Sequence, residues 1–406
     1  MVYQTNFNGY VAFLVQSALG TGSTGAGGTI LRQTGGTRAK MSMAAIQSKE
    51  IRADAQPVRG RHGLQTATGG PYSMELSLQS MDQIMQAVMR ATWDAEITLT
   101  STDFTSLTYG ANSIVFNSGS PITKGIRVND IIELTLAEDV SNKLKNYRVA
   151  ALSSTTITTV ETLTVDATAD TTATLKRRGR KIINPAAGAL VNRYFTIEDV
   201  ETDLTASRVF NDCFWKSMKF SMAPNGLIMF EPQWISTGAM TVNSGSPILT
   251  TPTLITNAPM AALDATLQLN GTVVADLTAF DLTVDNGSVA PAVVGAKVSP
   301  TVLPGLNQVT LNFTALQKDM SYISGFLNET GYSLNLRAVP NMAEPKDFIS
   351  INIPNFTLGG ADISPMSTAG GAATVSVTVP PALIGHDSTG TGYDDTTVSI
   401  QISNLT

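Results

Sequence analysis

Two histidines and one cysteine are the first side chains to consider for chemistry in this chain. His62 and His386 each lie in a polar stretch next to glycine. A Ser-His-Asp or Cys-His arrangement would have to use one of them, and neither lies in a motif with the strained turn that presents a nucleophile. Cys213 precedes Phe214 and Trp215, which favours a buried and unreactive thiol. Because it is the single cysteine, it also excludes a disulfide within the chain.

Motifs for metals and cofactors are weak. Asp387, Asp394 and Asp395 could ligate calcium, but the spacing of an EF-hand is absent, and no Cys/His cluster has zinc spacing. Residues 20–25 fit GxGxxG, yet a strand-like stretch follows where a dinucleotide site needs a helix, so a flexible loop is favoured. We therefore predict no catalytic residue, no metal and no cofactor. A β-rich glycosidase stays open as an alternative, because the separation of two carboxylates is a spatial quantity.

Composition and charge narrow the class further. Hydrophobic residues make up 43% of the 406 residues and charged residues 14%, which is typical of a globular chain with material for two or three domains. The net charge of −6 argues against a protein that grips nucleic acid through its overall field, but not against one that lets nucleic acid slide past. The apolar run 10–15 has no positive flank and is too short to span a membrane, so we expect a soluble, unprocessed chain.

The only dense basic run covers residues 176–181. It could contact nucleic acid or a protein partner. No aromatic residue is interleaved with it. We therefore favour a solvated segment that leads the chain back from the insertion, or a run that neutralises nearby acidic residues in an acidic protein.

A strand followed by a helix is the element around which the chain is organised. Residues 72–78 alternate polar and apolar side chains, as in a half-buried strand, and the next residues change to helical spacing. A second copy follows about 240 residues later, which predicts one module used twice. The apolar stripes, predicted to be core positions, are Met81, Ile84, Met85, Val88 and Met89 in the first helix and Met320, Ile323 and Leu327 in the second.

Outside the two helices the sequence predicts β-strands, and one domain is inserted into the first module. The predicted boundaries are residues 1–94 and 182–235 for a discontinuous first module, 95–181 for the insertion, 236–259 for a linker and 260–406 for the second module. Within the insertion, the predicted strands are 113–116, 125–128, 130–134, 147–149 and 156–160, which suit a small barrel.

Residues 35–70 are polar and have few apolar anchors. So long a connection inside a compact module is usually functional or ordered by a partner, and the alternative is a solvated loop. Its charged residues are Lys49, Glu50, Arg52, Asp54, Arg59 and Arg61.

In the order of these elements, the chain resembles the major tail tube proteins of long-tailed bacteriophages. The resemblance rests on residues 48–62 leading into 72–90 and Trp93, on residues 214–235, and on residues 279–287 with the second strand–helix unit. These patterns are diffuse, and their order carries the likeness. The inserted domain departs from the minimal module and could change what the tube exterior displays.

The resemblance implies a mainly β fold with two β-sandwich/barrel modules, each flanked by one α-helix, plus a small inserted β-barrel-like domain. In such tubes the inner sheets of neighbouring modules join into one barrel, single-module subunits form rings of six, and rings stack into a channel for DNA. Two modules per chain then imply a trimer with pseudo-sixfold symmetry. The helix is expected on the outer side of the sandwich, and the charged loop 35–70 between stacked rings.

The implied partners are further copies of this chain, the tape measure protein and phage DNA in the lumen, and the tail terminator and tail-tip proteins at the ends. The implied location is the virion, after assembly in the bacterial cytoplasm, with no membrane partner and no enzymatic activity. An acidic lumen would repel DNA phosphates and lower friction. The alternative outside this class is a multi-domain β adhesin or virion decoration protein, which would use the insertion but not two strand–helix units.

Overall fold

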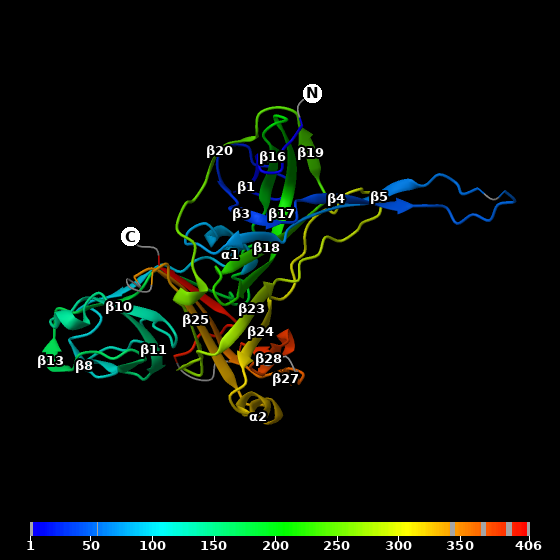
Figure 1. Ribbon diagram of the computed structural model, residues 1–406. Coiled ribbons are helices and arrows are strands. Elements are labelled where there is room, and N and C mark those ends of the chain that lie inside the picture. Colours follow the sequence, from blue (N-terminus) through cyan, green and yellow to red (C-terminus); the bar gives the residue numbers. More distant parts are fainter. Residues whose placement is uncertain (1–2, 55, 342–345, 367–370, 387–391, 404–406) are drawn as a thin grey trace.

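The computed structural model describes every residue except 1–2, 55, 342–345, 367–370, 387–391 and 404–406. Two β modules lie one beyond the other, an inserted β domain projects to one side, and a long hairpin projects to the opposite side (Figure 1). The predicted mainly β fold is confirmed. The helices α1 (Asp82–Val88) and α2 (Ser321–Leu327) are both short.

The first module has an outer sheet with the strand order β20-β2-β1-β16-β17, and β19 pairs with the first half of β17. Its strands are β1 (Gly9–Val15), β2 (Gly25–Ile30), β16 (Phe195–Glu201), β17 (Ala206–Met222), β19 (Met240–Asn243) and β20 (Leu249–Thr253). Residues 236–259, predicted as a linker, thus supply two strands to this sheet, because their Thr-containing segments pair with β17 and β2.

The first module's inner sheet is built on the second half of β17. That half pairs with β18, and β18 pairs in turn with β5 and β6. The outermost strands are β4 against β5 and β3 against β6. The bounds are β3 (Gln33–Gly36), β4 (Lys40–Ile46), β5 (Arg61–Gly69), β6 (Tyr72–Glu75) and β18 (Met229–Ser236).

The second module repeats this plan. Its inner sheet has the order β23-β24-β28-β27, and its outer sheet has the order β15-β30-β26-β25-β21-β22, with β29 against β26. The inner strands are β23 (Leu277–Asp285), β24 (Gln308–Leu316), β27 (Gly360–Ile363) and β28 (Thr374–Val379). The outer strands are β15 (Arg180–Ile183), β21 (Ala265–Leu269), β22 (Thr272–Val273), β25 (Tyr332–Ala338), β26 (Phe348–Phe356), β29 (Ile384–Gly385) and β30 (Ser399–Ser403).

The two inner sheets are joined by backbone pairing between β17 and β23. The ladder runs antiparallel from Ser217 opposite Asp285 to Met222 opposite Phe280. On the core side of this junction, Met218, Phe220, Leu282 and Val284 are fully buried. The modules therefore share one sheet and one hydrophobic core.

The inserted domain has its own sheet and its own core. The strand order is β13-β8-β9-β12-β11-β10-β14-β7. Of the predicted strands, residues 125–128 are not a strand, because Gly125 adopts a positive φ in a turn. The bounds are β7 (Ile97–Leu99), β8 (Leu107–Gly110), β9 (Ser113–Phe116), β10 (Ile131–Leu136), β11 (Asn146–Leu152), β12 (Thr156–Thr159), β13 (Asp166–Asp170) and β14 (Thr174–Arg177).

The end of the insertion differs from the predicted boundary at 181. β15 starts at Arg180 and pairs with β30, so Arg180 and Lys181 belong to the outer sheet of the second module. The insertion interrupts the first module in sequence, but the chain that leaves it first forms a strand of the second module, β15.

The two helix stripes differ in burial. Met81, Ile84, Met85, Val88 and Met89 are all fully buried, as predicted for a core helix. In the second helix Ile323 is only half-buried, and Met320 and Leu327 are 58% and 72% exposed, so their predicted place in the core of this chain is wrong. The reason is position: the second module covers α1, whereas α2 lies at the free end of that module (Figure 1).

This contrast can be tested with a matched pair of substitutions. Met81→Ala should lower the free energy of unfolding by about 2–5 kcal/mol, because it opens a cavity in a packed core. Met320→Ala should lower it by less than about 1 kcal/mol in the unassembled chain, because its side chain is exposed there. Urea denaturation of the unassembled variants measures both, and equal losses would contradict the difference in burial.

Candidate assembly surfaces

One face of the shared inner sheet is mostly polar, with Met229, Ile235 and Leu316 as the apolar residues that alternation also places on it. On β23, Phe280, Leu282 and Val284 point into the core, so the alternating residues Asp281 and Thr283 lie on the opposite face. The register carries this face across the junction: Asp281 lies opposite Ser221 of β17, and Thr283 lies opposite Lys219. On β24, β28, β18 and β6 the same face bears Thr310, Asn312, Thr314, Ser376, Thr378, Glu231, Gln233, Ser73 and Glu75.

Acidic residues outnumber basic ones on this polar face. Lys219 pairs with Asp281 at 3.0 Å, and the Lys216 ammonium lies 3.9 Å from Asp285. The strand register places Glu75, Glu231, Asp281, Asp285 and Asp362 on the face, against Lys40 and Lys219, and Lys216 lies beside Asp285 at a bulge. The face is therefore weakly acidic, and sequence reasoning could not have identified its members without knowing the register.

The inner sheet ends in an open edge on each side. At one end β27 is outermost, and at the other end β3 and β4 are outermost; within the described residues each has a pairing partner on one side only. An unpaired strand edge presents free N–H and C=O groups to another chain. These two edges are candidate contact sites for further copies of this protein.

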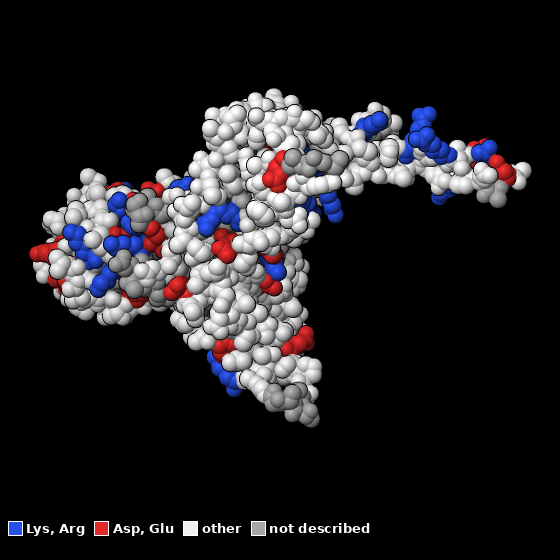
Figure 2. Space-filling view, turned by 45° about the horizontal axis from the view of Figure 1, so that its top comes forward, with Lys and Arg blue, Asp and Glu red and all other residues white. Residues whose placement is uncertain are grey.

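The predicted charged loop is a hairpin arm. β4 and β5 pair from Lys40 opposite Thr68 to Ile46 opposite Arg61, and the chain continues outward beyond them. The arm stands clear of the body, and its basic side chains are visible along its length (Figures 1 and 2). All six charged residues predicted for a stacking contact, Lys49, Glu50, Arg52, Asp54, Arg59 and Arg61, are exposed on it.

The corresponding connection in the second module, between β23 and β24, folds back onto the first module. The backbone N–H of Gln65, in the arm, donates to the Lys297 carbonyl at 2.7 Å, and Ser299 N–H donates to Thr237 at 2.8 Å. One free arm therefore projects from each chain.

The basic run 176–181 is neutralised locally rather than free. Lys176 pairs with Glu96 at 2.8 Å, Arg178 with Glu133 at 3.0 Å, and Arg180 with Asp82. Four of its five cations are matched by neighbouring acids, and Arg177 donates to the Ala95 carbonyl, which favours local neutralisation over a nucleic-acid surface.

Lys181 is the centre of a buried ion cluster between the insertion and the second module. Its ammonium contacts the carboxylates of Asp130 and Asp394, and these three side chains are 4%, 1% and 11% exposed. Burial raises the pKa of the Asp130 carboxyl group, and the Lys181 ammonium acts in the opposite direction. The Gln401 amide also bonds both the N–H and the carbonyl of Ile131, so the insertion is fixed to the second module.

Of the residues considered for chemistry that the structure describes, His386 and Asp395 are brought together, and no catalytic arrangement forms around them. His62 is exposed at the start of β5, and His386 pairs with Asp395 at 2.8 Å on the surface. Cys213 is buried, and burial raises the pKa of its thiol well above the ordinary value. Asp387 lies outside the described residues, and among those described no cluster suits a metal ion. Residues 25–30 of the glycine-rich stretch form β2 instead of opening a helix, which removes the geometry of a dinucleotide site.

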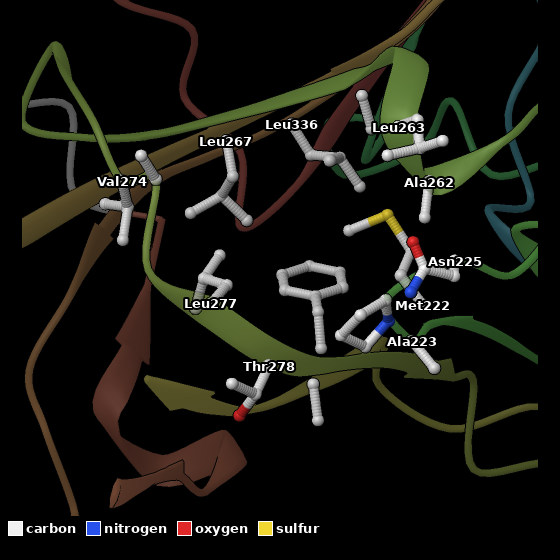
Figure 3. Close-up of a pocket in the computed structure, with 15 residues that line it drawn as sticks. Met222, Ala223, Asn225, Ala262, Leu263, Leu267, Val274, Leu277, Thr278 and Leu336 are labelled. Atoms are coloured by element: carbon white, nitrogen blue, oxygen red, sulfur yellow. The ribbon is translucent and has the colours of Figure 1, made fainter. Parts of the chain in front are cut away.

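An apolar pocket of 310 Å³ lies where the two modules meet, beside the start of β23 (Figure 3). Leu267, Leu277 and Leu336 line it together with Met222, and Asn225 and Thr278 are among its few polar residues. It contains no ionisable side chain, so it offers no acid or base for catalysis.

A duplicated sandwich with a shared polar sheet face, two open sheet edges and one projecting arm defines a subunit built for repetitive assembly. A family profile described as phage tail tube protein matches residues 6–380, and the chain belongs to this family. It is therefore a structural protein of a phage tail, part of the virion, that assembles with itself into the tail tube. A search of curated proteins finds no match. None of the helices in the described ranges has the length and apolar character needed to cross a membrane.

The ion cluster yields a prediction about stability. Lys181→Met should lower the free energy of unfolding by roughly 3–5 kcal/mol, because it removes the cation that both buried carboxylates contact directly. The loss should shrink as the pH falls toward the ordinary carboxyl range, because burial raises the pKa of the Asp130 carboxyl group and its protonation removes a buried charge.

The matched control is Lys124→Met. Lys124 pairs with Asp103 at 2.7 Å on the surface, so its removal should cost less than about 1 kcal/mol. Urea denaturation at pH 7 and pH 4 compares the two variants, and similar losses from both would contradict the proposed weight of the buried cluster.

Proposed function

We propose that three copies of this chain close into a pseudo-sixfold ring, and that stacked rings form a channel for DNA ejection into the host. The observation that carries the proposal is the pairing of β17 with β23 inside the chain. It joins the last inner strand of one module to the first inner strand of the next, and the same step can be repeated between chains.

The repeat assigns the strands that would pair between chains. In the inner-sheet order, β27 holds the position in the second module that the second half of β17 holds in the first. Likewise β3 and β4 correspond to β23. In the first module β3 and β4 pair with β6 and β5, which precede α1, and in the second module β23 pairs with β24, which precedes α2. Pairing β27 with β3–β4 of the next copy removes both open edges, and closure leaves no edge of the inner sheet exposed. With six module positions in a ring, as the family resemblance implies, two modules per chain give three chains.

Closure would turn the polar face of the inner sheet toward the lumen. The opposite face packs into the hydrophobic core, so only the polar face is free to line a channel. Its excess of Asp and Glu would repel DNA phosphates and provide few Lys and Arg side chains to hold them. The tape measure protein and DNA are the proposed occupants of this lumen, without sequence-specific binding.

The arm is the proposed contact between stacked rings. It stands clear of the body and exposes Ile51 completely and Ile46 at 60%, together with its charged residues. The inserted domain, fixed to the outer sheet of the second module, would decorate the tube exterior. Tail terminator and tail-tip proteins are the proposed partners at the ends of the tube, and host cytoplasm is the proposed place of assembly.

Electron microscopy and native mass measurement of the purified protein, alone and with its tail-assembly partners, test the ring. The expected result is a particle of three chains with pseudo-sixfold symmetry and a central channel, together with stacks of such particles. Monomers that persist at high concentration with those partners present would overturn the proposal.

The role of the arm is tested by shortening it. Replacing residues 47–60 by an Asn-Gly turn connects Ile46 directly to Arg61, a pair that already faces each other across the hairpin. We expect three-chain rings to form and their stacking into tubes to be lost. Normal tubes would show that the arm is only a solvated extension.

A matched control removes a different projection. Joining Ala95 to Arg180 through an Asn-Gly turn deletes the inserted domain but keeps β15, which the second module needs. Asp94 and Lys181 already lie side by side through a two-way backbone bridge, so the ends can be joined. This variant should form both rings and tubes.

A further inference from the structure

The two helices are the same structural unit at two places in the chain. In α1, the N–H groups of Met85, Met89, Arg90 and Ala91 donate to Met81, Met85, Ala87 and Gln86. In α2, the N–H groups of Ser324, Asn328, Glu329 and Thr330 donate to Met320, Ser324, Phe326 and Gly325, at a constant offset along the chain. Each helix ends on a non-glycine residue with positive φ, Arg90 at 53° and Glu329 at 49°. Residues of α1 and α2 therefore correspond one to one at this offset.

Inside the chain, the end of α1 is covered by the second module. Asn286 and Asn307 donate side-chain hydrogen bonds to the carbonyls of Val88 and Met89, at 3.4 and 3.2 Å. Arg90 donates to the Gly305 carbonyl at 3.0 Å. Asn286 follows β23 and Asn307 precedes β24, so the first inner strand of the next module and the connection after it form this cover.

The equivalent surface on α2 has no such cover. Val88 is fully buried, whereas its counterpart Leu327 is 72% exposed. Ala87 is 1% exposed, against 39% for Phe326. Among the residues that the structure describes, no side chain from another element donates to the carbonyls of Leu327 and Asn328. The apolar character of the stripe is nevertheless kept.

We propose that the exposed face of α2, formed by Met320, Phe326 and Leu327, is a docking surface for the first module of a second copy of this chain. The inference rests on the proposed ring and deepens it. In the ring, the next module after the second one is the first module of the neighbour, whose first inner strands are β3 and β4. The base of the neighbour's arm then covers α2, in the same way as β23 and the β23–β24 connection cover α1 within the chain.

The chemistry of the two covers differs in a way that fits each helix. α1 ends against two asparagines and is sealed by polar bonds. The base of the arm offers Met41, which is half-buried, and Met43, which is 38% exposed. Flexible methionine side chains suit the larger apolar residues Phe326 and Leu327 of α2. The face also continues onto β27, which α2 contacts and where Ile363 is 44% exposed, so it borders the strand edge proposed to pair with the same neighbour.

Leu327→Asp tests the docking surface. Because Leu327 is exposed in the single chain, the variant should fold with an unchanged melting temperature before assembly. A carboxylate in an apolar contact should raise the protein concentration needed for ring formation by more than about tenfold. Leu327→Met should assemble as the unaltered protein does. Val165→Asp, at a 64% exposed valine of the inserted domain, is the matched control and should also assemble normally.

Cross-linking identifies the partner surface. Leu327→Cys combined with Met43→Cys should give covalent links between chains through a short bifunctional maleimide in assembled rings, while buried Cys213 stays unreactive. Val165→Cys with Met43→Cys should give none. Rings formed by Leu327→Asp at the normal concentration, or no link between positions 327 and 43, would overturn the docking surface while the rings remain. Absence of rings in the unaltered protein would overturn the ring itself and this inference with it.

Discussion

The antiparallel ladder between β17 and β23 is the interaction on which the rest of the structure depends. Backbone pairing fixes both the distance between strands and the side to which each residue points, because side chains alternate along a strand. The ladder therefore aligns the polar residues of both modules on one face and their apolar residues in one core. A slip of β23 by one residue against β17 would turn Leu282 to the polar face while Phe220 stayed in the core. The strict register is what makes the two modules a single building unit.

The length of β17 makes this junction possible. The strand pairs with β16 and β19 through its first half and with β18 and β23 through its second half, so one segment belongs to both layers of the first module. In the second module the corresponding segment is divided into two separate strands, β26 and β27. Among the described strands, β27 pairs with one neighbour. The edge of β17 is thus paired with β23, whereas the equivalent edge of β27 is open. This difference favours the addition of further copies.

The inserted domain is tied down by different forces. Its core is separate, and its contact with the second module combines the buried Lys181 cluster, the Gln401 hydrogen bonds and a small apolar contact of Ile131 with Val339 and Phe348. A buried charge cluster is stable only when all its partners are in contact, because an unpaired carboxylate in the interior raises the free energy of the folded state. Such a contact holds the domain in a defined orientation on the body.

The sequence alone determined the class of fold, the repeat and the absence of an obvious catalytic motif, because hydrophobic periodicity and residue spacing are local properties. It marked the stripe from Met81 to Met89 correctly but could not distinguish it from that of Met320 and Leu327, since both have the spacing of a helix face. The tertiary structure decided which stripe is covered, which acids share the polar face, and that residues 35–70 form an arm. Each of these depends on which distant segments pair, and pairing between β17 and β23 or between β15 and β30 is not encoded in local pattern.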